Sequence, residues 1–175
     1  MCSFKSALCL RDRVFVPDYD SHEDMLKELG IQDDYLNASK TFVRVELSPA
    51  NGDKSSDPMG WKLKVDQDIR PEWFDPEVYE LRIKQAIADW CAVHVIKDGK
   101  REVKDGIWYA TGGATVRAYD SATVRACGNA TVILLKHFQT DKPVILSGEA
   151  VCVNHKTHTI RSAIKWTVET EEAST

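Results

Sequence analysis

Residues 114–137 read ATVRAYDS, ATVRACGN and ATVILLKH, which is one eight-residue phrase repeated three times. Within each phrase apolar and polar residues alternate, so that Ala and Val fall on one face of an extended strand and Thr and Arg on the other. Asp120 and Gly128 lie where the alternation breaks, and both residue types favour turns, Asp by bonding its own backbone and Gly by accepting a positive φ. The stretch therefore predicts short β-strands joined by turns.

The fixed period predicts a repeat architecture. Because eight is even, each new strand presents the same face inward, and the small side chains on that face indicate a thin core. We interpret residues 98–168 as a short parallel β-solenoid of eight-residue repeats, about two to a coil, in which each coil is buried by stacking on the next. An antiparallel meander with the same period is the alternative. Trp108 and Trp166 are the expected caps at the two ends.

The chain before the repeats predicts a small α+β domain over residues 1–97. Ser21 is the expected N-cap of a short helix that ends at Gly30. Asp75, followed by Pro76, opens a longer amphipathic helix, because Pro is favoured at the first helical position.

Strands are expected on both sides of the first helix. Residues 6–16 indicate a hairpin close to the N-terminus, and the alternating segments 41–48 and 61–65 are expected to pair with each other. Residues 169–175 are rich in Glu and are expected to form an acidic disordered tail.

Length and composition are those of an ordinary globular protein. The chain has 175 residues, of which 43% are hydrophobic, enough for one good core or two small ones. No apolar run approaches the ~20 residues of a membrane span, and no signal-peptide pattern is present. The five cysteines are an odd number without a C-x-x-C pair, which favours reduced thiols. We expect a cytoplasmic protein that does not enter a membrane.

The charge is unevenly distributed between the two parts. Residues 1–99 carry 13 Lys and Arg against 19 Asp and Glu, a net charge of −6, whereas residues 100–175 carry 10 against 8, a net charge of +2. The repeat region is therefore the part that could attract a polyanion, although a solvated basic surface explains the same count.

Several phrases of the chain resemble a group of uncharacterised small proteins from gut bacteria and their phages. The resemblance rests on MCSFKSA at residues 1–7, DSHED at 20–24, FVRVE at 42–46 and the octads that begin ATVRAY. It covers most of the chain and implies the same two-part architecture and a mobile-element origin. It implies no particular activity, substrate or catalytic residue.

Cys2 keeps an enzymatic function open. Methionine before a small residue is normally removed, which would leave a cysteine with both a thiol and a free α-amine. An α-amine has a pKa near ~8 and can act as general base for its own side chain. In this respect the start resembles N-terminal-nucleophile amidohydrolases and the proteases that crosslink to damaged DNA through an N-terminal cysteine.

Three further residues are candidate partners of such a nucleophile. His22 is the candidate acid or base, and Arg44 with Glu46 would assist if their face of the strand lines the same cleft. The alternative is a small thiol packed against the sheet and a histidine that only decorates a helix N-terminus.

Arg117 and Arg125 are the candidate binding residues of the repeat region. They occupy equivalent outward positions in successive octads, so we expect them to stack in a ladder with Tyr119 nearby. Guanidinium groups beside an aromatic ring suit phosphate binding and base stacking. Ile133 takes the third position, and an ordinary solvated solenoid surface is the alternative.

Two sets of metal-ligand residue types occur, and neither predicts a metal site. Cys152, His155 and His158 form C-x-x-H-x-x-H, but this spacing on a strand and turn does not force them to converge, and a fourth ligand is missing. A group of carboxylates before the long helix is explained by capping and solubility; it comprises Asp66, Asp68, Glu72 and Asp75. We expect neither a metal nor a cofactor.

Two functions from different classes remain. The first is a binding protein whose repeat surface engages a protein, nucleotide or nucleic-acid partner in a phage–host or anti-defence setting, since repeat arrays offer extended surfaces. We also expect a homodimer through an open edge of the solenoid. The second is an enzyme that uses Cys2 as nucleophile on an amide, an ester or damaged nucleic acid.

Overall fold

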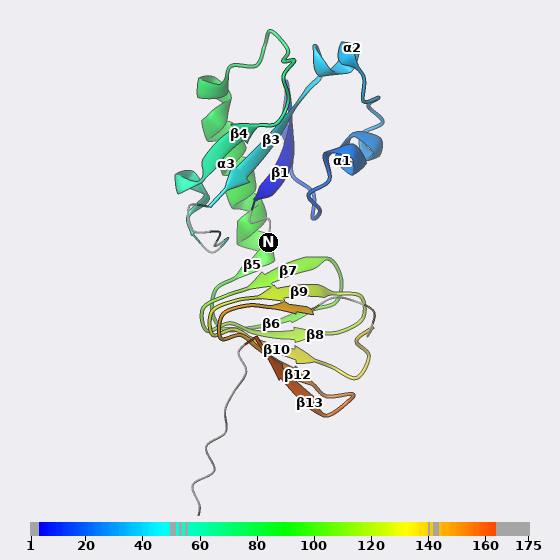
Figure 1. Cartoon of the computed structure of the whole chain (residues 1–175), viewed down its shortest axis with the longest axis vertical. Helices are drawn as coiled ribbons and strands as arrows, with labels where there is room; N and C mark the ends of the chain where they lie inside the picture. The colour runs from blue at the N-terminus through cyan, green and yellow to red at the C-terminus, as the bar shows by residue number, and fades with distance from the viewer. Residues whose placement is uncertain are drawn as a thin grey trace, which may run out of the picture. The chain divides into compact units, whose positions relative to one another are not determined.

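The computed structural model describes residues 4–163 except 50, 51, 53, 55, 140, 142 and 143. It divides the chain into two compact units, Met1–Val95 and Ile96–Thr175, whose elements are labelled in Figure 1. Trp166 and the predicted acidic tail lie outside the described residues. None of the described helices is long and apolar enough to cross a membrane.

The first unit is built on a four-stranded antiparallel sheet in the order β2-β1-β3-β4. Its strands are β1 (Lys5–Leu10), β2 (Val14–Phe15), β3 (Phe42–Ser48) and β4 (Lys62–Val65). The predicted hairpin and the predicted pairing of the third and fourth strands are both confirmed. A 3₁₀ turn, η1 (Pro58–Gly60), precedes β4.

Both faces of β1 are buried. On one face Leu8 and Leu10 pack with Met25 and Leu26 of helix α1 (His22–Glu28). On the other, helix α3 (Pro76–His94) contacts β1 and β2. The helix starts follow the predicted caps, because the side chains of Ser21 and Asp75 accept bonds from the backbone N–H groups of Asp24 and Glu77. A second short helix, α2 (Tyr35–Ala38), leads into β3.

Lys5 is an unusual member of the face that α3 covers. Its side chain is fully buried, lies 4.6 Å from the Trp90 ring, and donates to the Asp20 carboxylate at 2.8 Å. Burial lowers the pKa of Lys5, and the nearby Asp20 carboxylate opposes that shift.

The second unit is a β-solenoid, as predicted. One sheet contains β6 (Lys100–Val103), β8 (Thr115–Ala118), β10 (Thr131–Leu134), β12 (Val151–Asn154) and β13 (Thr159–Ser162); the other contains β5 (Val95–Ile96), β7 (Ile107–Ala110), β9 (Thr123–Ala126) and β11 (Val144–Leu146). Successive strands from β5 to β12 alternate between the two sheets, and Figure 1 shows them stacked as coils.

The register within each sheet is parallel. Thr131 lies opposite Thr115, and Thr123 lies opposite Ile107, so neighbours in space are two octads apart in sequence. The parallel solenoid therefore holds for every described pair except β12 with β13, which is antiparallel. An antiparallel meander is excluded for the other pairs.

The core between the two sheets is thin because its inward side chains are small. Ala and Val fill most of it, and the fully buried positions include Val116, Val124 and Val132. Phe138, in the longer connection after β10, adds the one large aromatic ring to the buried cluster.

Each end of this core carries an arginine at an inward position of the register. Arg101 lies opposite Val116, and its guanidinium stands 4.7 Å from the ring of Trp108, the residue predicted as a cap. Arg161 lies opposite Cys152 at the other end. A long polar side chain at these positions does not offer the apolar surface on which another coil would stack.

One corner of the solenoid is a stack of three glycines. Gly112, Gly128 and Gly148 have φ values of +56°, +59° and +62°, which an L residue rarely adopts. A Cβ at Gly128 would lie 3.3 Å from the backbone N of Gly112, and one at Gly148 would lie 3.0 Å from the backbone N of Gly128. Glycine is required here both by φ and by the close approach of the next coil.

The tightest of these positions is Gly112, where a Cβ would lie 2.6 Å from the Lys97 carbonyl oxygen. We expect Gly112→Ala to lower the free energy of unfolding of the solenoid by more than about 2 kcal/mol, because backbone strain of about 1–2 kcal/mol adds to the overlap. Urea unfolding followed by circular dichroism measures it.

Two glycines provide matched controls. Gly99 has a φ of +69° but open space around its Cβ position, so Gly99→Ala is expected to cost only the strain. Gly113 has neither constraint, and Gly113→Ala should change stability by less than about 0.5 kcal/mol. Equal effects at all three positions would contradict the role of the coil-to-coil approach.

Candidate functional site

Three of the four predicted catalytic residues lie together on the first unit. His22 is the first residue of α1, and Arg44 and Glu46 lie on β3. Cys2 lies outside the described residues.

The alternation of β3 determines which face these side chains occupy. Arg44 and Glu46 share a face with Phe42, and they lie opposite Leu8 and Ser6 of β1. Helix α1 covers the apolar part of this face, around Phe42. The short helix leaves the polar part open, where a pocket of about 410 Å³ is lined by Ser21, His22, Glu23, Asp33, Arg44 and Asp66.

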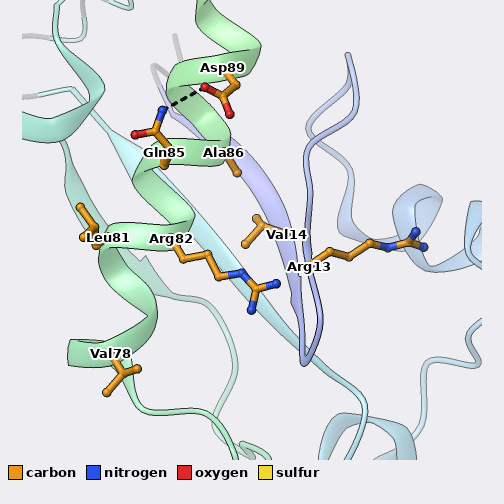
Figure 2. A pocket seen from close by; sticks show the side chains of 8 residues that line it. All are labelled: Arg13, Val14, Val78, Leu81, Arg82, Gln85, Ala86 and Asp89. Atoms are coloured by element: carbon orange, nitrogen blue, oxygen red, sulfur yellow. Dashed lines mark hydrogen bonds between the residues drawn. The ribbon is translucent and has the colours of Figure 1, made fainter.

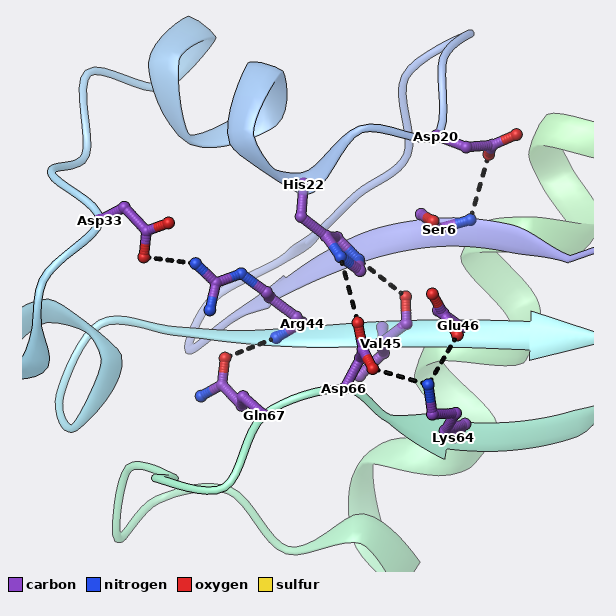
Figure 3. A network of polar contacts seen from close by, with 10 residues as sticks. All are labelled: Ser6, Asp20, His22, Asp33, Arg44, Val45, Glu46, Lys64, Asp66 and Gln67. Atoms are coloured by element: carbon purple, nitrogen blue, oxygen red, sulfur yellow. Dashed lines mark hydrogen bonds and ion pairs between the residues drawn. The ribbon is translucent and has the colours of Figure 1, made fainter.

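Asp66 is the centre of the polar network in this pocket (Figure 3). Its carboxylate accepts from the Lys64 ammonium at 2.6 Å, and the same ammonium reaches the Glu46 carboxylate at 3.3 Å. Lys64 lies directly opposite Glu46 in the pairing of β3 with β4. The sheet register thus places one cation between two carboxylates.

The contacts of His22 orient its ring. The side chain is only 11% exposed, and its Nε2 lies 3.3 Å from the Val45 carbonyl oxygen. A carbonyl only accepts, so Nε2 carries the hydrogen in this contact. The other nitrogen, Nδ1, faces Asp66 Oδ2 at 3.9 Å, which exceeds hydrogen-bond length.

Arg44 and Glu46 do not act as a pair. The Arg44 guanidinium bonds to the Asp33 carboxylate, whereas Glu46 turns toward Lys64 (Figure 3). The backbone of Arg44 is fixed by Gln67, whose side-chain oxygen accepts from the Arg44 N–H at 2.9 Å. Arg44 therefore lines the pocket beside Asp33, whereas Glu46 joins the network through Lys64.

The electrostatics of the network are mutual. Hydrogen bonds to Asp66 and then Glu46 raise the pKa of Lys64. The hydrogen bond from Lys64 lowers the pKa of Asp66, burial opposes this shift, and the charges of Lys64 and Arg44 add to the lowering. Both groups are therefore held in their charged forms.

Sequence reasoning did not associate Asp66 and Lys64 with this site. Lys64 could have been found, because pairing of the two alternating strands places a lysine opposite Glu46. Asp66 follows β4 and was interpreted as part of an acidic group before the long helix. Among the described residues, one group of three metal-ligand types converges: His22, Glu46 and Asp66 offer ligand atoms within 4.8 Å of one another.

In the solenoid, the predicted arginine ladder is wrong. Arg117 lies on β8, between Glu102 and Ile133 of neighbouring strands, and its guanidinium bonds to Glu102 at 2.9 Å. Arg125 lies on β9, in the other sheet, next to Tyr109. A coil holds two octads, so equivalent residues of successive octads fall on different sheets.

The remaining predicted binding residues have other neighbours. The Arg125 guanidinium lies 5.7 Å from the Tyr109 ring, and Tyr119, in the turn after β8, has the Lys104 ammonium 5.5 Å from its ring. Arg125 and Lys104 thus each lie near a different aromatic ring. The predicted binding residues Arg117, Tyr119 and Arg125 do not form one surface.

A different surface emerges on the outward face of the five-stranded sheet. The register aligns one row across the strands, in the order Glu102, Arg117, Ile133, Val153 and Ile160. The row changes from charged to apolar along the solenoid. Its last member, Ile160, is 72% exposed.

The three residues of the C-x-x-H-x-x-H pattern lie in different surroundings. Cys152 is buried in the core, and burial raises the pKa of its thiol. His155 and His158 are exposed in the turn between β12 and β13. Asp75, from the acidic group before the long helix, caps α3.

A second hollow of about 610 Å³ lies between β2 and α3 (Figure 2). Val78 and Leu81 line it together with Arg13 and Arg82. None of the predicted catalytic or binding residues that the structure describes lines this hollow.

Comparison of the chain with protein-family models, with curated proteins and with solved structures finds no match.

Lys64→Met tests the coupling in the pocket. Since the hydrogen bond from Lys64 is the largest cause of the lowered Asp66 pKa, we expect that pKa to rise toward its ordinary value of 3.8. Titration of the side-chain carboxyl ¹³C shift measures it. Lys62→Met, at an exposed position of the same strand, is the control and should leave Asp66 unchanged. An unchanged Asp66 pKa in Lys64→Met would show that this contact does not form.

Proposed function

We propose that the chain is an interaction protein that binds a protein partner through the outward face of the five-stranded solenoid sheet. The first partner we propose is a second copy of the chain. The observation that carries the proposal is the apolar end of the outward row, Ile133, Val153 and Ile160. A setting in phage–host or anti-defence interaction is suggested by the resemblance of the sequence to small proteins of gut bacteria and their phages.

The row favours protein over nucleic acid. A surface that tracks a phosphate backbone needs several unpaired cations along one line. Here Arg117 is already bonded to Glu102, and Arg125 lies on the other sheet. An exposed Ile160 beside the half-buried Val153 and Ile133 forms an apolar strip, and exposed apolar strips are typical of protein–protein contacts.

The strand β13 supplies the geometry for self-association. It is the last strand of its sheet among the described residues, so one side of its backbone lacks a strand neighbour there. A two-fold axis perpendicular to the sheet pairs such an edge with itself in antiparallel fashion and keeps the two outward faces continuous. Centred on Ile160, that pairing places the two Ile160 side chains opposite each other and extends the apolar row across both copies.

Ile160→Glu tests the proposal. We expect the wild-type chain to have twice its 19.7 kDa mass in sedimentation or light scattering over a concentration series, and the variant to be monomeric. Burial of one isoleucine side chain contributes about 1.5–3 kcal/mol to the free energy of association, and a symmetric dimer buries two such side chains.

The matched control is Leu81→Glu, which changes a side chain of similar exposure, 68%, on α3. It should leave the mass unchanged. A wild-type chain that is monomeric at every concentration, or a dimer that survives Ile160→Glu, would overturn the proposed self-association.

A second function, the enzyme with Cys2 as nucleophile, is favoured by one observation. His22 and Arg44, chosen from sequence as its partners, line one pocket, and Glu46 lies in the same polar network. In that function His22 moves the proton, and Arg44 offers a charged donor to a developing oxyanion.

Cys2 reactivity tests this second function. We expect intact mass to show that Met1 is removed, and alkylation located by peptide mapping to be fastest at Cys2, with an apparent pKa below ~8.5. Burial raises the pKa of Cys9 to about 12 and also that of Cys152, so both should react slowly. Cys127, which is partly exposed, is the internal comparison. Retention of Met1, or a Cys2 no faster than Cys127, would exclude this function.

A further inference from the structure

We propose that His22, Glu46 and Asp66 form a binding site for a divalent transition-metal cation, of which Zn²⁺ is the best match. The three residues come from three elements: the start of α1, the middle of β3 and the end of β4. One imidazole nitrogen and two carboxylate oxygens are a ligand set that zinc accepts. This inference rests neither on the proposed self-association nor on Cys2.

The orientation of His22 is the observation that points to a cation. Its Nε2 hydrogen is directed at the Val45 carbonyl oxygen, so in the neutral ring the Nδ1 lone pair faces the Asp66 carboxylate. In this tautomer Nδ1 and Asp66 Oδ2 are both electron-pair donors, and their 3.9 Å separation is beyond hydrogen-bond length and within reach of one shared cation. Metal-binding histidines characteristically donate their other N–H to a backbone carbonyl or carboxylate, which orients the ring and selects the tautomer.

The spacing suits a metal ion. Zinc lies about 2.0–2.2 Å from nitrogen and oxygen ligands, so an ion bound to both Nδ1 and Oδ2 fits the 3.9 Å gap with a bent ligand–metal–ligand angle. The ligand atom of Glu46 lies within 4.8 Å of the other two. Glu46 is therefore the third ligand of the proposed site, and the adjoining pocket leaves room for water as a fourth.

The charge around the site also favours a cation. Four carboxylates, Glu23, Asp33, Glu46 and Asp66, are accompanied by two basic groups, Arg44 and Lys64. Arg44 is bonded to Asp33, on the side away from Glu46. The other carboxylates, Glu23, Glu46 and Asp66, outnumber the one other basic group, Lys64.

Lys64 makes the inference specific to this chain. Its ammonium lies within bonding distance of Asp66 Oδ1 and Glu46 Oε2, so it neutralises the two carboxylates that would bind the metal ion. The side chain is 61% exposed and has a flexible four-carbon stem, which allows it to turn into solvent. Lys64 and the metal ion therefore compete for the same two carboxylates.

Isothermal titration of the untagged full chain with ZnCl₂ tests the site. We expect one saturable site per chain. His22→Ala and Asp66→Asn should each weaken binding at least about tenfold, since loss of even an outer-shell partner has that effect. Lys64→Met should tighten binding, because it removes the competing ammonium. His137→Ala, an exposed histidine of the solenoid, is the control and should bind as the wild type does.

The outcomes separate the alternatives. Zinc held by cysteine thiols or by solenoid histidines would bind equally well in His22→Ala and Asp66→Asn, and that result would overturn the site. No saturable binding in either the wild type or Lys64→Met would also overturn it. Tighter zinc binding by Lys64→Met is a gain that a folding defect does not produce. Circular dichroism is the check that His22→Ala is folded. The oligomeric mass is measured separately, so failure of this site leaves the self-association unaffected.

Discussion

Close approach of successive coils at one corner is the constraint on which the solenoid depends. At Gly112, Gly128 and Gly148 the backbone of one coil lies where a side chain of the next would be, and each residue has a left-handed φ. This approach holds the parallel strands in a register of two octads, so that Ala and Val suffice to fill the space between the sheets. Larger inward side chains would push the sheets apart and separate the corner that the glycines bring together.

The first unit owes its polar pocket to the brevity of α1. The helix is seven residues long and covers Leu8, Leu10 and Phe42, but it does not extend over Arg44 and Glu46 on the same face. Strand alternation places polar residues at those uncovered positions, and the paired strand contributes Lys64 opposite Glu46. A charged network on a sheet face is stable here because Arg44 and Lys64 pair with carboxylates while the pocket keeps the whole group partly solvated.

Local patterns predicted most of the fold. The alternation in 114–137 identifies both the strands and their inward face, because burial repeats with the period of the backbone itself. Helix starts at Ser21 and Asp75 follow from cap chemistry that involves only neighbouring residues. These predictions hold because each depends on contacts within a few residues.

The predictions that were wrong or incomplete depend on long-range geometry. Arg117 and Arg125 are equivalent in the octad, but the neighbours of a residue in the sheet are two octads away, so Ile133 and not Arg125 lies beside Arg117. Likewise the face shared by Arg44 and Glu46 is predictable from alternation, whereas the approach of Asp66 to His22 requires both the register of β3 with β4 and the docking of α1. Alternation within a strand determines neither the register of β3 with β4 nor the docking of α1.

The way in which the solenoid ends explains why its outward face and its edge become available together. Arg161 takes an inward position beside Cys152, where a long polar side chain offers no apolar surface for a further coil, and the chain reverses direction in the antiparallel pair of β12 with β13. The same reversal carries Ile160 to the outward face at the sheet edge, beside Val153. On β13, Arg161 therefore lies at the end of the core on one face, and its neighbour Ile160 exposes apolar surface on the other face. Among the described residues β13 is the last strand of this sheet, so no described coil stacks beyond its inner face and no described strand pairs with its outer backbone edge. The proposed pairing with a second copy would satisfy the edge and cover Ile160 without requiring any change in the coils that precede it.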